Sequence, residues 1–266
     1  MRYGAMNFPV KPVLEEIRSF AAMGFDYVEL SMDPPQAHYS ILRRQRAEIA
    51  AALGQCGLGV VCHLPTFVLP ADLTDSLRAA SIEEMRHSLE VAAELGAGKA
   101  VLHPCPRSGM GLMVPVVVRG HALDFFAIMV ERAGTLGVTL CLENMFPRYG
   151  FGVEAAEFVE FFTLFPTLRM TLDVAHAHID GGRDRRLREL LRAASGRIAH
   201  IHVSDNFGRR DDHLELGKGD IDLPAMARQL KAIGYDDTIT LEVFDPDRQA
   251  LAASRRRLQQ LFSTLR

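Results

Sequence analysis

The chain has 266 residues, a length that suits one large catalytic domain or two small ones. Hydrophobic residues make up 48% and charged residues 24%, which is ordinary for a folded protein with a large buried core. The formal net charge of -3 provides no overall attraction to nucleic acid or to anionic membranes. We therefore do not expect nucleic acid as a partner.

No targeting segment is visible in the sequence. The N-terminal residues lack the apolar stretch of a signal peptide, and no apolar run approaches the ~20 residues of a membrane span. We expect a cytoplasmic protein with no membrane association. The four cysteines form no C-x-x-C pair and are expected to be reduced and mostly buried.

Short apolar segments alternate with amphipathic helical segments along the chain. Each apolar segment is rich in Val, Ile, Leu or Thr on both faces, as expected for a strand covered by helices. The predicted strands are Tyr3–Phe8, Tyr27–Ser31, Gly59–Leu64, Ala100–His103, Val138–Glu143, Arg169–Val174, Ile198–Val203 and Thr238–Val243.

Helices are predicted between these strands, and the clearest end next to a glycine. One of them begins with Ser81 and Glu84 in capping-box spacing. These helices are Pro12–Met23, Ser81–Leu95, His121–Leu136 and Asp222–Ile233. Repeated strand-then-helix units without a linker predict a single (β/α)8 TIM barrel over residues 1–266. A doubly wound open sheet is the alternative, but its glycine-rich nucleotide motif is missing.

The active site of such a barrel lies at the carboxyl ends of the strands. Strands three to eight each deliver an imidazole or a carboxylate to that end, and the loop after strand seven adds another pair. One such residue alone is more often structural, because an acid there often caps the next helix. Together they are costly to gather without a cation, and they are ligand types for Zn and Mn. The residues are His63, His103, Glu143, Asp173, His176, His202, Asp211, His213 and Glu242.

Two residues near this set are interpreted differently. His200 shares a strand face with His202 but lies one layer deeper, so we expect it to support that ligand. Lys99 is interpreted as ordinary solvent-facing charge.

The types and strand positions of these residues resemble the xylose isomerase-like TIM-barrel superfamily over nearly the whole chain. That superfamily includes sugar isomerases and epimerases, and also the endonuclease IV type of apurinic-site nuclease. The segments Ile201–Asn206 and His213–Asp222 look like its sugar phosphate isomerase/epimerase branch.

The resemblance implies a metal and a pair of catalytic acids. In the epimerases one divalent ion (Mn, Zn, Mg or Co) is held by a set that corresponds to Glu143, Asp173, His202 and Glu242. The two glutamates, Glu143 and Glu242, also act as the acid/base pair. In the nucleases the same positions hold three zinc ions, with His63, His103, His176, Asp211 and His213 as the additional ligands.

Three functions follow as hypotheses. The first is a metal-dependent sugar or sugar phosphate isomerase/epimerase that moves a proton through a metal-stabilised enediolate. The second is a zinc phosphodiesterase acting on apurinic sites in DNA, which the slightly acidic charge and the absence of Trp do not favour. The third is a non-catalytic binding protein on the same scaffold, which the intact glutamate pair opposes.

A small carbohydrate is the expected substrate. The predicted substrate-binding residues are His63, His103, His176, Arg209 and Lys218. Arg209 and Lys218, like Arg107 and Arg210, lie on loops expected at the carboxyl ends of the strands. There they could bind a phosphate or a sugar acid. The alternative is that they are ordinary solvated surface charges.

The apolar segment 109–118 follows the fourth strand. We interpret it either as a lid or subunit contact or as a simple packed segment before a helix. A homo-oligomer is compatible with the first interpretation.

Overall fold

The computed structural model is a closed barrel of eight parallel strands, and it describes residues 1–107, 109–182 and 184–264. Each strand pairs with the next in sequence, and β8 pairs with β1 to close the ring. The strands are β1 Arg2–Met6, β2 Tyr27–Ser31, β3 Gly59–His63, β4 Lys99–Leu102, β5 Thr139–Glu143, β6 Arg169–Asp173, β7 Ile198–Val203 and β8 Thr238–Leu241. The predicted (β/α)8 barrel is confirmed, although residues 265–266 of the predicted domain lie outside the described residues.

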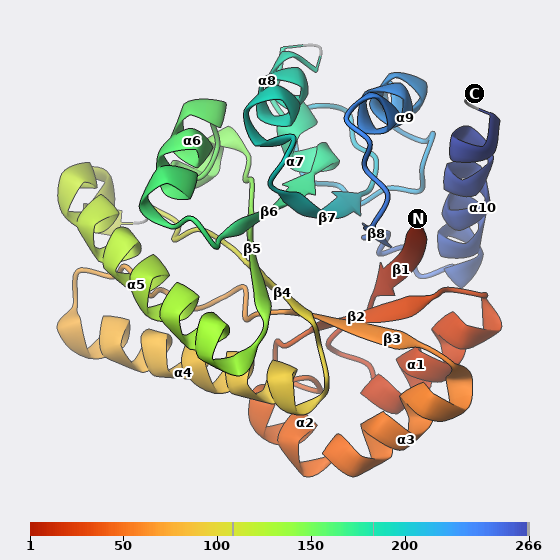
Figure 1. Ribbon diagram of the computed structural model, residues 1–266, viewed down its shortest axis with the longest axis horizontal. Helices are drawn as coiled ribbons and strands as arrows, with labels where there is room; N and C mark the ends of the chain where they lie inside the picture. Colours follow the sequence, from red (N-terminus) through yellow and green to blue (C-terminus); the bar gives the residue numbers. More distant parts are fainter. Residues whose placement is uncertain (108, 183, 265–266) are drawn as a thin grey trace.

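Helices surround the barrel on all sides (Figure 1). They are α1 Val13–Ala22, α2 Tyr39–Arg44, α3 Arg46–Cys56, α4 Asp75–Glu94, α5 Pro115–Leu136, α6 Ala155–Leu164, α7 Val174–His178, α8 Arg185–Ala194, α9 Leu223–Ala232 and α10 Arg248–Thr264. Two 3-10 turns, η1 Gly109–Leu112 and η2 Pro147–Tyr149, follow β4 and β5. Among the helices of the described residues, none combines the length and the apolar composition that spanning a bilayer requires.

Several predicted boundaries differ from the structure. β4 and β8 end one residue before His103 and Glu242, so these two side chains project from the loops just beyond their strands. The helix predicted to start at Ser81 begins earlier, at Asp75, and the Ser81 hydroxyl instead accepts a hydrogen bond from the Leu69 backbone N–H. The helix predicted from His121 begins at Pro115, since proline in the first turn sacrifices no helical hydrogen bond.

The apolar segment 109–118 runs through η1 into the first turn of α5. Met110, Met113 and Val116 are 71%, 75% and 80% exposed, while Val118 is buried. The segment is thus only partly packed, and its role as a lid or subunit contact stays a prediction.

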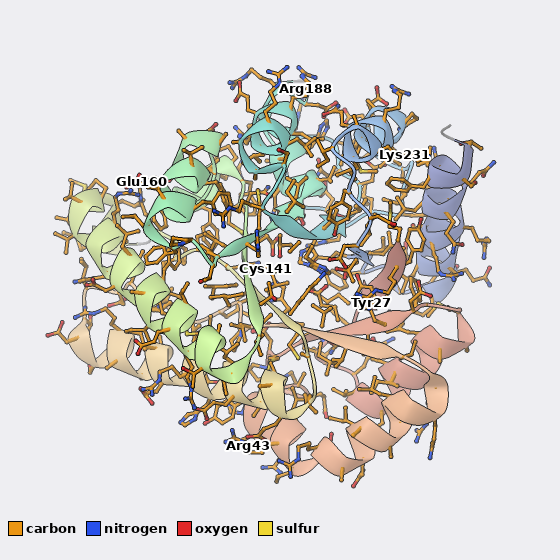
Figure 2. The ribbon with its side chains drawn as sticks, viewed as in Figure 1. Tyr27, Arg43, Cys141, Glu160, Arg188 and Lys231 are labelled. Atoms are coloured by element: carbon orange, nitrogen blue, oxygen red, sulfur yellow. The ribbon has the colours of Figure 1, made fainter. Side chains whose placement is uncertain are left out.

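The strands have an outer apolar face and a mixed inner face. Most of the hydrophobic core lies between the outer strand faces and the helices. Inside the barrel, a small separate cluster consists of Tyr27, Val61 and Val101. Figure 2 shows Tyr27 and Cys141 among the strands and Arg43 on the outside of the ring. Cys62, Cys105 and Cys141 are buried free thiols, as expected.

A register shift between β6 and β7 decides which way the β7 histidines face. Met170 pairs with Ile198, but Thr171 pairs with His200 and Asp173 with His202, so β7 has one extra residue at this point. Bulges of this kind re-aim the side chains that follow them. Paired residues on parallel strands point to the same face, so the shift turns His200 and His202 toward the barrel interior, where Asp173 points.

The same shift gives Lys99 a structural role. Its Nζ donates to the backbone carbonyl of Ala199, at 2.6 Å, and also contacts Asp237 and Thr238. The Lys99 side chain is only 16% exposed. The interpretation of Lys99 as solvent-facing charge is therefore wrong. Ala199 is the extra residue of β7, and its carbonyl needs the hydrogen-bond donor that Lys99 supplies.

Gly4 of β1 is required by a close approach of the Tyr27 ring. A Cβ at this position would lie 2.2 Å from a carbon of that ring, which is wholly buried and hydrogen-bonded to Thr240. We predict that Gly4→Ala lowers the unfolding free energy by about 1–3 kcal/mol through overpacking. Gly54→Ala on α3, where a Cβ meets nothing within 4 Å, should raise it by about 0.5–1 kcal/mol. Denaturant unfolding measures both; equal effects would contradict this account.

Candidate metal centre and active site

Glu143, the last residue of β5, is the point on which four histidines converge. Its Oε2 lies 3.2 Å from His103 Nε2, 3.3 Å from His202 Nδ1 and 3.4 Å from His63 Nε2. Its Oε1 lies 3.1 Å from His176 Nδ1. The carboxylate is 1% exposed. Two histidines at the carboxyl ends of β3 and β7, and two from the segments just after β4 and β6, therefore meet around one buried negative charge.

His202 presents Nδ1 to three carboxylates. This nitrogen lies 2.8 Å from Glu242 Oε1, 3.3 Å from Glu143 Oε2 and 3.9 Å from Asp173 Oδ2. Despite these short distances, Nδ1 has no hydrogen bond of acceptable geometry to any described residue. An imidazole nitrogen among three carboxylate oxygens has the composition of a divalent-cation site.

The remaining predicted residues form a second, adjoining group. Asp211 Oδ2 lies 3.1 Å from His176 Nε2 and 3.0 Å from His213 Nε2. His213 Nδ1 in turn lies 3.7 Å from Glu242 Oε2. His213 has a φ of +48°, a left-handed conformation that is uncommon for a residue other than glycine and that tends to cluster at functional sites. The structure thus brings all the predicted ligand candidates into one connected cluster.

The donor set fits a metal ion. Ligand atoms of Asp173, His202 and Glu242 lie within 4.8 Å of one another, as do those of His63, Glu143 and His202 and those of Glu143, Asp173 and His176. Asp211 Oδ1 is also buried without a hydrogen-bond partner among the described residues. Buried polar atoms without partners are costly, and a cation would remove that cost.

Crowding of acids changes their protonation. Burial, together with the nearby Glu143 and Glu242 carboxylates, raises the pKa of Asp173 to about 7. Burial alone would also raise the pKa of Glu143, but the His202 and His103 imidazoles hold it well below its usual range. Burial would lower the pKa of His213, yet its hydrogen bond to Asp211 raises it to about 9.

Asn144 and Asp173 fix each other at the ends of β5 and β6. The Asn144 side-chain amide donates to the Asp173 carbonyl and its oxygen accepts from the Asp173 N–H, both at 2.8 Å. Asp173 also caps α7, because its Oδ1 accepts from the His176 N–H. The structural role expected of an acid at a strand end is therefore present here, and the role of Asp173 as a metal ligand stays a prediction.

Asp205 anchors the loop that carries Asp211 and His213. Its backbone forms an antiparallel bridge with Leu214, and its carboxylate accepts from the backbone N–H groups of Gly217 and Ile221. Sequence reasoning did not assign this role, because nothing local in the sequence pairs Asp205 with residues 12 and 16 positions later.

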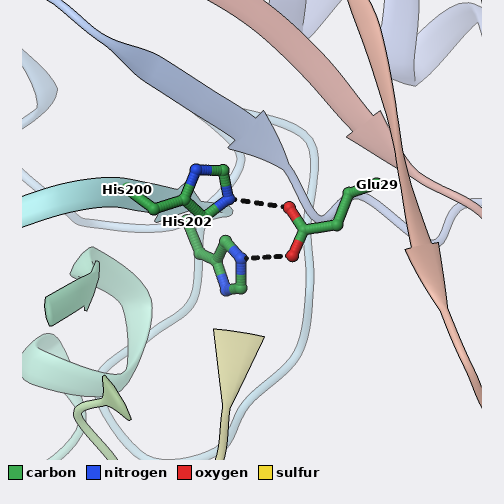
Figure 3. Close-up of side chains that lie close together, drawn as sticks. All are labelled: Glu29, His200 and His202. Carbon is green, nitrogen blue, oxygen red and sulfur yellow. Dashed lines mark hydrogen bonds and ion pairs between the residues drawn. The ribbon is translucent and has the colours of Figure 1, made fainter. Parts of the chain in front are cut away.

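Glu29 of β2 is a second residue that sequence reasoning missed. It is completely buried, and its two carboxylate oxygens face His200 and His202 (Figure 3). Its signal is the alternation Tyr27, Glu29, Ser31, which places three polar side chains on one face of a predicted strand. A carboxylate on a completely buried strand needs buried partners.

A pocket of about 600 Å3 opens above the cluster. Its walls are largely apolar and aromatic, with Phe8, Phe67, Phe146, Tyr149 and Phe244, while Glu143 and Glu242 lie on its polar side. Of the described residues that line it, none is a lysine or an arginine. Arg209 and Lys218 are exposed and lie outside this lining, so their contact with substrate stays a prediction.

Comparison with known proteins places these observations in a family context. A family model described as xylose isomerase-like TIM barrel matches residues 17–261. An uncharacterised protein of Methanocaldococcus jannaschii, MJ1311, is 26% identical over 255 residues, covering 91% of this chain and 83% of that protein. L-ribulose-5-phosphate 3-epimerase UlaE of Salmonella paratyphi A is 25% identical over 257 residues, covering 90% and 85%.

A crystal structure of a D-tagatose 3-epimerase-like protein superposes with a TM-score of 0.87. It is 24% identical, and the superposition covers 99% of this chain and 97% of that one. At this identity the likeness supports the fold.

Protons and a metal cation should compete for the same ligand atoms at the carboxyl ends of the strands. Asp173 is protonated below about pH 7 and His213 below about pH 9, and both must lose a proton to act as ligands. We predict that the affinity of the protein for Zn²⁺ falls as the pH is lowered from about 9 to about 6. Competition with a chromogenic chelator measures this, with calorimetry in two buffers to count released protons. Equal affinity across this range would show that neither Asp173 nor His213 is a ligand.

Proposed function

The chain belongs to the family of xylose isomerase-like TIM barrels, and we propose that it is a divalent-metal-dependent sugar isomerase or epimerase. The observation that carries the proposal is the approach of Glu143 and Glu242 to one atom, His202 Nδ1, at 3.3 and 2.8 Å. Two carboxylates on the wall of one pocket can serve as a proton acceptor and a proton donor. The similarity to UlaE, named as a sugar phosphate epimerase, supports an enzyme of this type.

Glu143, Asp173, His202 and Glu242 would hold the metal ion. When bound there, a divalent cation supplies Lewis-acid stabilisation of negative charge on the substrate's oxygens. The surrounding imidazoles contribute by orienting these carboxylates. His103 and His63 contact the Glu143 oxygen that also faces His202, which limits the positions this carboxylate can adopt.

Proton transfer falls to the two glutamates. The pKa of Glu143 is held well below its usual range and that of Glu242 is also lowered, in both cases by histidines that outweigh burial, so both are ionised near neutrality. One carboxylate removes the proton from the carbon next to the carbonyl and becomes the acid. The other, once it has taken up a proton from water, gives that proton to the opposite face of the carbon, and the first then releases its proton to water. The apolar and aromatic side chains of the pocket wall lower the polarity around the reacting carbon.

The pocket favours an uncharged sugar. Aromatic rings such as Phe8 and Phe244 suit the C–H faces of a carbohydrate. A phosphate is normally held by arginine, lysine or a helix N-terminus, and the described lining offers neither basic side chain. We therefore propose an unphosphorylated ketose as the first substrate to test, with Arg209 and Lys218 as contacts only for a substrate that extends out of the pocket.

An apurinic-site phosphodiesterase is the second candidate. The adjoining group of His176, Asp211 and His213 favours it, because these donors could hold more than one ion. The lack of lysine and arginine in the described pocket lining opposes it, since DNA binding depends on phosphate neutralisation. A zinc-loaded protein that leaves an apurinic-site duplex uncut would remove this candidate.

We predict that turnover of a ketose in D2O incorporates deuterium at the carbon next to the carbonyl. Glu143→Gln should lower kcat by a factor of about 10²–10⁴, because the amide cannot accept the proton. Mass spectrometry of the product and initial rates with Mn²⁺, Mg²⁺ or Co²⁺ measure these effects.

Glu160→Gln on the outer face of α6 is the matched control, because Glu160 pairs with Arg119 away from the pocket. It should keep the rate of the unaltered protein. Ketose turnover by Glu143→Gln at that same rate would end the proposal.

A further inference from the structure

A continuous polar chain runs through the barrel interior beneath the candidate metal centre. Lys99 Nζ donates to Thr238 Oγ1 at 3.0 Å, and Thr238 Oγ1 lies 2.7 Å from His200 Nδ1. His200 Nε2 lies 2.8 Å from Glu29 Oε2, and Glu29 Oε1 lies 3.0 Å from His202 Nε2 (Figure 3). His200, His202 and Glu29 are completely buried. This series of hydrogen bonds therefore links Lys99, at the amino ends of the strands, to the candidate ligand His202 through side chains that are shielded from solvent.

The direction of each hydrogen bond in this chain is fixed by its ends. Lysine only donates, so Thr238 accepts from Lys99 and can donate its own proton to His200 Nδ1. At the other end the Glu29 carboxylate accepts, so His200 carries its proton on Nε2 and donates it to Glu29, which leaves Nδ1 to accept from Thr238. An ionised carboxylate only accepts, so His202 must also donate its Nε2–H to Glu29.

Thr240 and Tyr27 complete the surroundings of Glu29. The Thr240 hydroxyl donates to Glu29 Oε2, and the Tyr27 hydroxyl lies 2.8 Å from Thr240 Oγ1. Both Glu29 oxygens therefore accept hydrogen bonds. The possible metal-ligand atoms of Glu29, His200 and His202 lie within 4.8 Å of one another, a spacing that would suit a metal ion. Since both oxygens already have N–H or O–H partners, this triad is better described as a hydrogen-bonded support.

We propose that Glu29 is a positioning residue that fixes the tautomer of His202, so that Nε2 carries the proton and Nδ1 is free to bind the metal. The inference rests on the metal site of the proposed function. The geometry that supports it is the opposite placement of the two ring nitrogens: Nε2 faces Glu29, and Nδ1 faces Glu143, Asp173 and Glu242. A carboxylate behind a metal-binding histidine both orients the ring and increases its basicity.

Zinc affinity tests the role directly. Glu29→Gln keeps the size of the side chain but loses the charge and cannot accept from both imidazoles, so the dissociation constant for Zn²⁺ should rise about 10–100-fold. Glu90→Gln is the matched control, because the Glu90 carboxylate also contacts a histidine, His87, but on the outer helix α4. Its zinc affinity should equal that of the unaltered protein.

A merely structural role for Glu29 predicts a different result. In that case Glu29→Gln would have a lower unfolding free energy than the unaltered protein but the same affinity for Zn²⁺. This result would overturn the inference and leave the proposed function standing. If the unaltered protein itself binds no Zn²⁺, both the inference and the proposed function fail.

A measurement on the unaltered protein covers the case in which Glu29→Gln does not fold. Nitrogen-15 NMR of the zinc-loaded, histidine-labelled protein should show a proton on His202 Nε2 and a metal-shifted Nδ1 without one. A proton on Nδ1, with Nε2 bare, would overturn the inference whatever the affinity measurements show.

Discussion

The mouth of this barrel depends on the electrostatic balance between clustered carboxylates and imidazoles. Glu143, Asp173, Asp211 and Glu242 lie close together, and three of them are buried almost completely. Such a group is stable only if positive charge or shared protons offset the repulsion and the loss of hydration. The histidines that contact Glu143 and Asp211 provide part of that balance. A divalent cation would provide the rest, which is why the proposed metal and the fold of the mouth belong together.

Support for this cluster comes from polar residues that do not enter the pocket. Asn144 clamps the ends of β5 and β6, Asp205 holds the loop after β7, and Glu29 stands behind His202. Each uses buried hydrogen bonds, which resist change because a broken one leaves an unsatisfied group. Candidate ligands on the strands and on the loops beyond them are thereby held in place, as a site that must keep a fixed geometry requires.

The pocket combines this polar floor with an aromatic wall. In the proposed function the carboxylates at the base move protons, and rings such as Phe146 and Phe244 lower the polarity of the same volume. Low polarity around the reacting groups strengthens every charge interaction below them. The lack of lysine and arginine in the described lining shifts the expected substrate toward an uncharged sugar and away from DNA.

The sequence by itself determined the barrel and most of the candidate centre. Eight β-rich segments with helices between them specify a parallel barrel, and parallel strands bring all their carboxyl ends to one side. Residues such as His63, Glu143 and Asp173 therefore could be grouped without coordinates. The start of α4 was mistaken because Ser81 and Glu84 imitate a helix cap inside a longer helix.

Only the tertiary structure decided how the strands' inner faces meet. The extra residue at the β6–β7 pairing turns the β7 histidines inward. Lys99 packs inside the barrel at its amino-terminal end, where it donates a hydrogen bond to the carbonyl of Ala199. Glu29 reaches His202 across the barrel from β2, a strand that is not a neighbour of β7. Local sequence patterns encode which face of a strand is buried, but distances across a closed barrel depend on the register of every strand in the ring.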